Sequence, residues 1–180
     1  MTSDATALFS TPRLFARHCL EADLPALLAV YGDAAAMQGV DDGEPLSEAD
    51  CARWLQITLE NARRQRSGML ALVSRQHGGV LGFCGLLQPE GETEVELKFA
   101  LLRSHWGQGL AGEMLPALLD WGWHWHAFAR VVAICVPENT AARRVLEQAG
   151  FRYTEMRAED DGRLMDILTW QARPGSAATA

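Results

Sequence analysis

The chain has 180 residues, of which 48% are hydrophobic and 22% charged, as expected of one folded globular domain. Its 16 Lys and Arg residues against 23 Asp and Glu residues give a net charge of −7, which argues against nucleic acid as a partner. The four cysteines are scattered without a CxxC pair, so we expect neither a metal site nor a disulfide framework. No apolar run reaches the ~20 residues that span a membrane, and no signal-peptide pattern opens the chain, so we expect a cytoplasmic protein without a membrane partner.

Hydrophobic periodicity and turn residues predict seven strands and four helices, with a loop over residues 32–45. The strands are expected at residues 11–18, 69–74, 80–87, 94–101, 130–136, 151–157 and 164–170. The helices are expected at residues 24–31, 47–66, from the glycine stretch to about 129, and 140–149. Residues 1–10 and 171–180 are expected to be a flexible leader and tail around a single domain of residues 11–170.

The order of these elements predicts a mixed sheet. Three strands between residues 69 and 101 follow one another through short turns, which predicts an antiparallel meander. Residues 130–136 are almost all apolar and rich in β-branched side chains, as in a fully buried parallel strand. The strand–helix–strand unit in the middle of the chain should therefore be parallel and right-handed.

A glycine-rich stretch lies where the strand ending at Leu101 gives way to the long helix. Gly107, Gly109 and Gly112 lack a Cβ atom, so a ligand can come close to the backbone there. Free N–H groups and the positive end of the helix dipole attract an anion, above all a phosphate. We therefore predict a phosphate-bearing ligand at residues 107–112.

The same glycines satisfy the GxGxxG pattern of dinucleotide-binding folds, and Glu138 stands where such folds place a ribose partner. Against this interpretation, a doubly wound sheet needs several parallel strands, whereas the sequence predicts one strand–helix–strand unit after a meander. An NAD(P)-dependent oxidoreductase is therefore the weaker alternative.

Two longer segments resemble the GCN5-related N-acetyltransferase (GNAT) family. They are Phe99-Ala-Leu-Leu-Arg-Ser-His-Trp-Gly-Gln-Gly-Leu-Ala-Gly-Glu113 and Pro137-Glu-Asn-Thr-Ala-Ala-Arg-Arg-Val-Leu-Glu-Gln-Ala-Gly-Phe151. The opening Thr11-Pro-Arg-Leu14 is similar to the branch that contains the ribosomal-protein N-terminal acetyltransferases. The resemblance implies a seven-stranded, mostly antiparallel α/β (α+β) sheet, split at a central parallel pair, with helices on both faces.

The resemblance also implies that acetyl-CoA is the co-substrate and that a primary amine accepts the acetyl group. Unpaired backbone groups near the end of the strand would bind the amide arm of CoA, as an added strand does. The pyrophosphate would lie on the N–H groups between Gln108 and Gly112. Asn139 matches a family position near the cofactor, although it is equally a plain helix cap. The implied CoA-binding residues are Phe99, Ala100, Leu101, Gly107, Gln108, Gly109, Leu110, Ala111, Gly112 and Asn139.

Direct transfer to an amine requires a base, because a free amine is protonated near neutral pH. Glu96 matches an acidic position that this branch often carries, and Glu94 is the reserve candidate on the same face of the strand. Alternatively, Glu94 and Glu96 simply belong to the solvent-exposed face of this strand and have no catalytic role. The oxygen of the tetrahedral intermediate would accept a hydrogen bond from a backbone N–H near Phe99 or Ala100.

Several positions depart from the family pattern. Leu146 stands where the family commonly has Tyr, and Ala142 where this branch often has Ser. The group that protonates the departing thiolate is therefore open, with Tyr31, Tyr153 and His105 as unranked candidates. Lys98 replaces a common Gly, and Trp106 replaces an Arg or Gln that contacts phosphate. These departures keep open a non-catalytic acyl-CoA-binding module. A protein N-terminus, a polyamine and an aminoglycoside-type antibiotic all remain open as acceptors.

An aromatic stretch ends the long helix. His124 and His126 are two residues apart and point in different directions on a helix, so they cannot chelate one metal ion. Trp121, Trp125 and Phe128 share one face, which predicts core packing. Trp123 points elsewhere and is a candidate homodimer contact.

Overall fold

The computed structural model describes residues 7–37, 43–64, 68–88, 94–159 and 161–172. Eight strands form one sheet in the order β1-β2-β3-β4-β5-β6-β8-β7. The strands are β1 (Phe9–Ser10), β2 (Leu14–His18), β3 (Met69–Ser74), β4 (Val80–Leu87), β5 (Glu96–Leu101), β6 (Arg130–Cys135), β7 (Arg152–Ala158) and β8 (Leu164–Gln171). The helices are α1 (Leu24–Tyr31), α2 (Ala34–Met37), α3 (Glu48–Arg63), α4 (Leu110–His126) and α5 (Thr140–Gln148), with short 3-10 turns η2 (Glu21–Asp23) and η3 (Arg103–His105).

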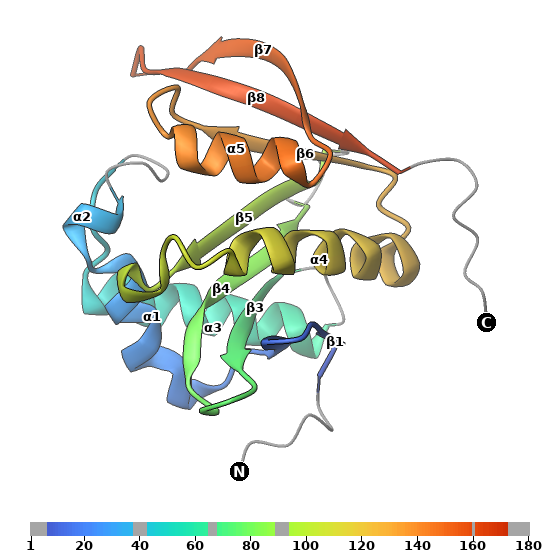
Figure 1. Cartoon of the computed structure of the whole chain (residues 1–180). Helices are drawn as coiled ribbons and strands as arrows, with labels where there is room; N and C mark the ends of the chain where they lie inside the picture. Colours follow the sequence, from blue (N-terminus) through green and yellow to red (C-terminus); the bar gives the residue numbers. More distant parts are fainter. Residues whose placement is uncertain (1–6, 38–42, 65–67, 89–93, 160, 173–180) are drawn as a thin grey trace.

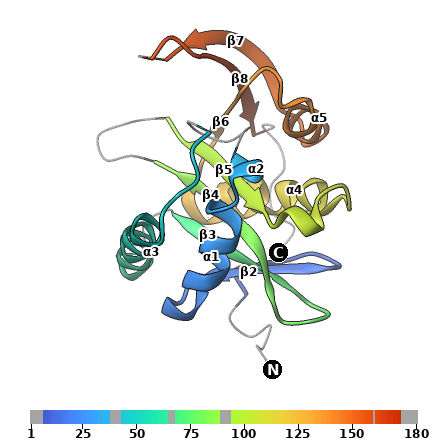
Figure 2. The ribbon, with the colours of Figure 1, turned by 90° about the vertical axis from the view of Figure 1, so that its left-hand side faces the viewer.

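Helices cover both faces of the sheet. Figure 2 shows α1 and α3 on one side of strands β3 to β5, and α4 and α5 on the other. Among the described strands, β5 and β6 form the one parallel pair, and every other pair is antiparallel. This confirms the predicted mixed, mostly antiparallel sheet with a central parallel pair. None of the helices in the described ranges is long and apolar enough to cross a membrane.

The strand count differs from the seven that the sequence predicts. The eighth strand is β1, which pairs antiparallel with β2 through Phe9 and Ala16 and lies inside the predicted leader. A strand of two residues is too short to show an alternating pattern, so periodicity cannot reveal it. The predicted loop over residues 32–45 also contains the short helix α2. The ends of the predicted leader and tail, residues 1–6 and 173–180, lie outside the described residues.

Two apolar clusters fill the space between the sheet and its helices. One packs α4 and α5 against the sheet and includes Leu97 and Leu101 of β5. The other packs α1 and α3 against the opposite face and includes Ala100. Successive residues of a strand point to opposite faces. The side chains of Glu96 and Lys98 therefore lie on the α1–α3 face, while the α4 helix and its N-terminus lie on the other.

The aromatic end of α4 is only partly as predicted. Trp121 is buried, but Trp125 is 76% exposed, so its assignment to the core is wrong. Trp125 borders a second hollow of about 530 Å³ next to His18 and Met69. The spacing of aromatic residues identifies a helix face, but it does not show how far along the helix the covering elements extend. Trp123 is half-buried, and its role as a dimer contact stays a prediction.

A buried ion pair joins β2 to the start of α1. The Arg17 guanidinium donates to both carboxylate oxygens of Asp23, at 2.7 and 2.8 Å. Their side chains are 9% and 5% exposed. The Asp23 carboxylate also accepts from the Leu20 N–H, which fixes the turn into the helix.

Removing one partner of this pair should destabilise the fold strongly. Asp23→Ala leaves a buried guanidinium without its counter-charge, which costs about 3–5 kcal/mol of unfolding free energy. Urea denaturation followed by circular dichroism measures the loss. Glu60→Ala is the control, because its ion pair with Arg64 is exposed and contributes far less. Equal losses in the two variants would contradict a structural role for the buried pair.

Candidate active site

A cavity of about 790 Å³ crosses the sheet. On the α4 face it is bordered by Gly107 and residues 109–112 of the glycine turn, and by Asn139 at the start of α5. On the α1–α3 face it is bordered by Tyr31 and Trp54, among others. Because these residues lie on opposite faces of the sheet, the cavity must pass between two strands, and its lining places that passage between β5 and β6. These two strands are neighbours in the middle of the sheet (Figure 1).

The passage opens because the parallel pair ends early. The register joins Glu96 to Val132 and Leu97 to Ala133, and β5 and β6 share no further pairing among the described residues. The Val95 carbonyl accepts from the Val132 N–H of β6, whereas the Leu102 N–H donates to the Leu81 carbonyl of β4. Backbone groups alternate in direction along a strand, so those of Phe99 face the gap and those of Ala100 face β4.

The carbonyl of Leu101 also faces the gap but already has a partner. It accepts a hydrogen bond of 2.9 Å from the Trp106 indole nitrogen. Trp106, which stands where the family pattern has Arg or Gln, thus ties the glycine turn to the end of β5. Of the three predicted backbone contacts on β5, the geometry therefore favours Phe99.

Two residues of the glycine turn adopt a left-handed backbone conformation. Gly107 and Gly109 adopt φ values of 71° and 74°, which side chains rarely tolerate. Helix α4 begins at Leu110, so the first N–H groups of the helix are exposed at this turn. A Cβ atom added at Gly107 or Gly112 would meet no heavy atom within 4 Å. The turn thus combines open space with backbone donors and a positive helix end, which fits a phosphate group.

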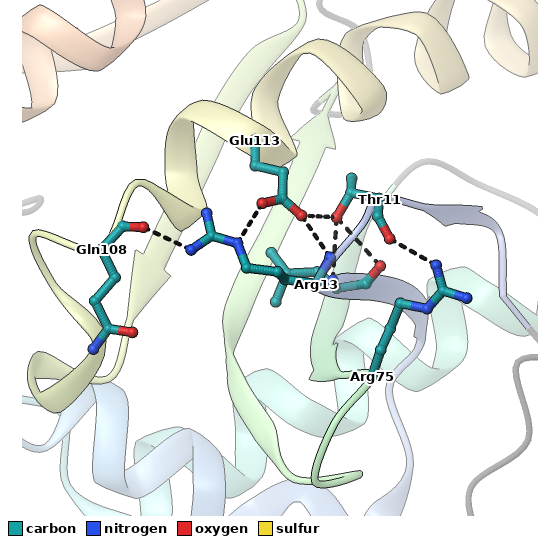
Figure 3. Close-up of polar contacts among 6 residues, drawn as sticks. Thr11, Arg13, Arg75, Gln108 and Glu113 are labelled. Carbon is teal, nitrogen blue, oxygen red and sulfur yellow. Dashed lines mark hydrogen bonds and ion pairs between the residues drawn. The ribbon is translucent and has the colours of Figure 1, made fainter.

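A side-chain network that the sequence did not reveal braces this turn (Figure 3). The Arg13 guanidinium donates to Glu113 Oε2 at 2.6 Å and to the Gln108 carbonyl at 2.8 Å. Glu113 Oε1 accepts from the Arg13 N–H at 2.8 Å and from the Thr11 hydroxyl at 2.5 Å. Arg75 in turn donates to the Thr11 carbonyl at 2.9 Å. The segment before β2 therefore holds both the turn and the first helical turn of α4.

The same network sets the charge of Glu113. Burial alone would raise the pKa of its carboxyl group, but the hydrogen bonds from Thr11 and Arg13 outweigh burial and hold that pKa below its usual value. The carboxylate is therefore ionised in the folded protein and neutralises Arg13 beside the glycine turn.

The two candidate bases have different surroundings. Glu96 borders the cavity, its side chain is 27% exposed, and the Lys98 ammonium lies 3.6 Å from its carboxylate. Glu94 does not border the cavity, and its carboxylate accepts a 2.6 Å hydrogen bond from Arg130. Of the two candidate bases, Glu96 is therefore the one that can approach a ligand in the passage.

The positions discussed for proton donation also separate. Tyr31 and His105 border the cavity, as do the replacements Ala142 and Leu146. Tyr153 does not, and its ring lies 5.2 Å from the Arg143 guanidinium. Asn139 borders the cavity and also caps α5, with its Oδ1 accepting from the Ala142 N–H at 3.0 Å.

One cysteine borders the passage. Burial, followed by the nearby Asp166 carboxylate, raises the pKa of the Cys135 thiol, so the thiol stays protonated at neutral pH. A protonated thiol is a poor nucleophile, so the surroundings of Cys135 disfavour an acyl-cysteine intermediate at this residue.

Comparisons with known proteins agree with this architecture. A model of the acetyltransferase (GNAT) domain matches residues 13–152. The protein YkkB of Bacillus subtilis is 31% identical over 104 residues, a match that spans 57% of this chain and 60% of that protein.

Solved structures with the same fold include ribosomal-protein acetyltransferases. One, from Salmonella typhimurium, modifies the N-terminal serine of a 50S ribosomal subunit protein; it has a TM-score of 0.76 and 19% identity, covering 91% of this chain and 97% of its own. Another, RimL in complex with coenzyme A, has a TM-score of 0.76 and 19% identity over 89% of this chain and 95% of its own. At 19% sequence identity, this similarity shows that the chain shares the fold of these two proteins.

A side chain at the glycine turn should remove phosphate binding. Gly109→Val forces a β-branched residue into a φ of 74° and turns the following N–H groups away from the cavity. We expect no measurable CoA affinity by isothermal titration calorimetry, with a circular dichroism spectrum that remains folded. Gly79→Val is the matched control in an open turn and should bind normally. Unchanged CoA affinity in Gly109→Val would refute the placement.

The ionised Glu113 should make stability depend on pH. Its folded-state pKa is depressed, so its contribution is complete above the unfolded-state pKa and is lost as the pH falls through the folded-state value. Between neutral pH and about pH 3, the free energy of unfolding should therefore fall less in Glu113→Gln than in the wild type. In the control variant Glu60→Gln, which changes an exposed ion pair, it should fall as much as in the wild type. Identical profiles for wild type and Glu113→Gln would contradict the brace.

Proposed function

Because the chain belongs to the GNAT family of acetyltransferases, in the branch that resembles the ribosomal-protein N-terminal enzymes, we propose that it transfers an acetyl group from acetyl-CoA to a primary amine. The observation that carries the proposal is the cavity that joins a phosphate-binding helix end to an acid-bearing pocket through the gap between β5 and β6. An acetyl donor with a long, thin arm fits such a passage. A nicotinamide dinucleotide usually binds at the edge of a sheet with several parallel strands, and the described strands contain one parallel pair.

The chain offers acetyl-CoA a site along the whole passage. The N–H groups of residues 108–112 would hold the pyrophosphate, with Gly107 and Gly109 keeping the backbone open. The backbone groups of Phe99 would pair with the amide arm, because they face the gap beyond the last residue paired to β6. RimL, which shares the fold, was solved in complex with coenzyme A, and this supports coenzyme A as the kind of ligand that the passage accepts.

The proposed chemistry is a direct attack. Glu96 accepts a proton from the incoming ammonium, directly or through a water molecule, and the neutral nitrogen attacks the acetyl carbonyl carbon. A backbone N–H near Phe99 would donate to the oxygen as it gains charge. The carbon–sulfur bond then breaks, the acetyl group stays on nitrogen, and the thiolate takes up a proton from solvent or from a group bordering the passage.

The proposal treats residues 11–170 as one catalytic domain in the cytoplasm. The four cysteines are all free and buried, which is the usual state in a reducing compartment. The charge of −7 suits encounters with cationic amines.

A thiol-release assay tests the proposal directly. The purified chain is mixed with acetyl-CoA and a panel of primary amines, free CoA is measured with a thiol reagent, and the acetylated amine is identified by its mass. We expect amine-dependent CoA release, and thermal stabilisation by acetyl-CoA but not by NADH. Stabilisation by acetyl-CoA without turnover of any amine would indicate a binding module, and stabilisation by NADH alone would indicate an oxidoreductase.

Glu96 should be required for turnover but not for CoA binding. Glu96→Gln removes the proton acceptor, so kcat should fall about 10²–10⁴-fold near neutral pH. The loss should shrink at high pH, where more of the amine arrives deprotonated, and the Kd for CoA should stay unchanged. Glu94→Gln is the matched control, since Glu94 pairs with Arg130 outside the cavity. Wild-type kcat in Glu96→Gln across the pH range would exclude Glu96 as the base.

A further inference from the structure

The acceptor side of the cavity is lined mainly by apolar side chains. On the α1–α3 face, six such residues come from five different elements and one loop. We call them the acceptor wall: Tyr31, Met37, Leu46, Trp54, Met69 and Leu87. An apolar wall of this kind binds the body of a ligand by excluding water rather than by forming hydrogen bonds.

Two aromatic rings give the wall a fixed shape. The centroids of the Tyr31 and Trp54 rings lie 5.7 Å apart, and both rings pack against Phe83, at 6.2 and 6.0 Å. Phe83 is fully buried, so it supports the two rings from behind. The three rings are inclined to one another by 39° to 81°, so they form a rigid, angled surface that suits another compact apolar group. Met37 and Met69 are flexible enough to adjust around such a group.

Few charges accompany this wall. Among the described residues, the acceptor side has the carboxylates of Glu44 and Glu96 and the ammonium of Lys98. The Lys98 ammonium lies 3.6 Å from the Glu96 carboxylate, so this acid already has a cationic neighbour. A ligand with several ammonium groups would therefore meet few carboxylates among the described residues of this side.

We propose that the acceptor is a small primary amine with a single positive charge, carried on an apolar group of about the size of an aromatic ring. The apolar group packs against Tyr31 and Trp54, and the amine points toward Glu96 at the passage to the acetyl group. The electron-rich ring faces would also attract the ammonium before it loses its proton. The inference rests on the proposed function and narrows its substrate.

The same features disfavour the other acceptors that the sequence leaves open. A polyamine or an aminoglycoside carries several ammonium groups, and each one without a carboxylate partner would lose its hydration against an apolar wall. A peptide would bring several backbone amides to a wall whose polar side-chain groups are the Tyr31 hydroxyl and the Trp54 indole N–H. Each amide left unpaired would cost about as much as a lost hydrogen bond.

Steady-state kinetics on a panel of amines test the inference. The panel contains 2-phenylethylamine and tryptamine, then spermidine, kanamycin and a short peptide with an N-terminal serine. We expect the two arylalkylamines to have the highest kcat/KM, at least about tenfold above the others, as burial of one ring in a preformed pocket predicts. A higher kcat/KM for spermidine, kanamycin or the peptide would overturn the inference while leaving the acetyltransferase proposal intact. No turnover of any amine would instead overturn the proposed function and the inference with it.

Substitutions of Trp54 locate the effect on the wall. Trp54→Ala should raise the KM for 2-phenylethylamine about tenfold or more without changing the Kd for CoA. Trp54→Phe should recover most of the loss, because it restores a ring. Trp125→Ala is the matched control, since Trp125 is exposed and lies outside this cavity. An unchanged amine KM in Trp54→Ala, with normal CoA binding, would overturn the placement of the apolar group.

Discussion

The site depends on one break in backbone pairing. Strands β5 and β6 are hydrogen-bonded neighbours only as far as Leu97 and Ala133, after which β6 continues its ladder with β8. A central pair that separates leaves strand N–H and C=O groups without the partners that a continuous sheet provides, and such groups need another partner when buried. The gap therefore supplies both a route through the sheet and the hydrogen-bonding edge that an extended ligand would use.

The two halves of the site serve opposite electrostatic needs. On the α4 face, the glycine turn presents backbone donors and a positive helix end, and the ionised Glu113 holds Arg13 against the turn. On the α1–α3 face, the carboxylates of Glu96 and Glu44 lie beside an apolar wall. An anionic donor and a cationic acceptor are thus directed to opposite ends of one passage and meet where the strands part. The fold separates the two substrates by the sheet itself.

Local features of this site could be predicted from the sequence, whereas features made by distant residues could not. The glycines, the cap at Asn139 and the apolar strand β6 carry strong local signals, and the sheet confirms the parallel pair that they predicted. The Arg13–Glu113 contact joins residues 100 positions apart, so no periodicity encodes it. Trp125 shares a helix face with Trp121 but is mostly exposed, because burial depends on how far the neighbouring elements extend. The two-residue strand β1 is likewise created by its partner β2 rather than by its own pattern.

Amide hydrogen exchange with and without CoA tests the central claim most directly, because it reports on the backbone groups that the gap leaves open. The account predicts slower exchange on CoA binding at two places, the N–H of Phe99 and those of residues 109–112. The β7–β8 hairpin, which is paired along its length, should be unaffected. Protection that is absent from both places, or confined to the hollow beside Trp125, would show that the passage between β5 and β6 does not hold the cofactor.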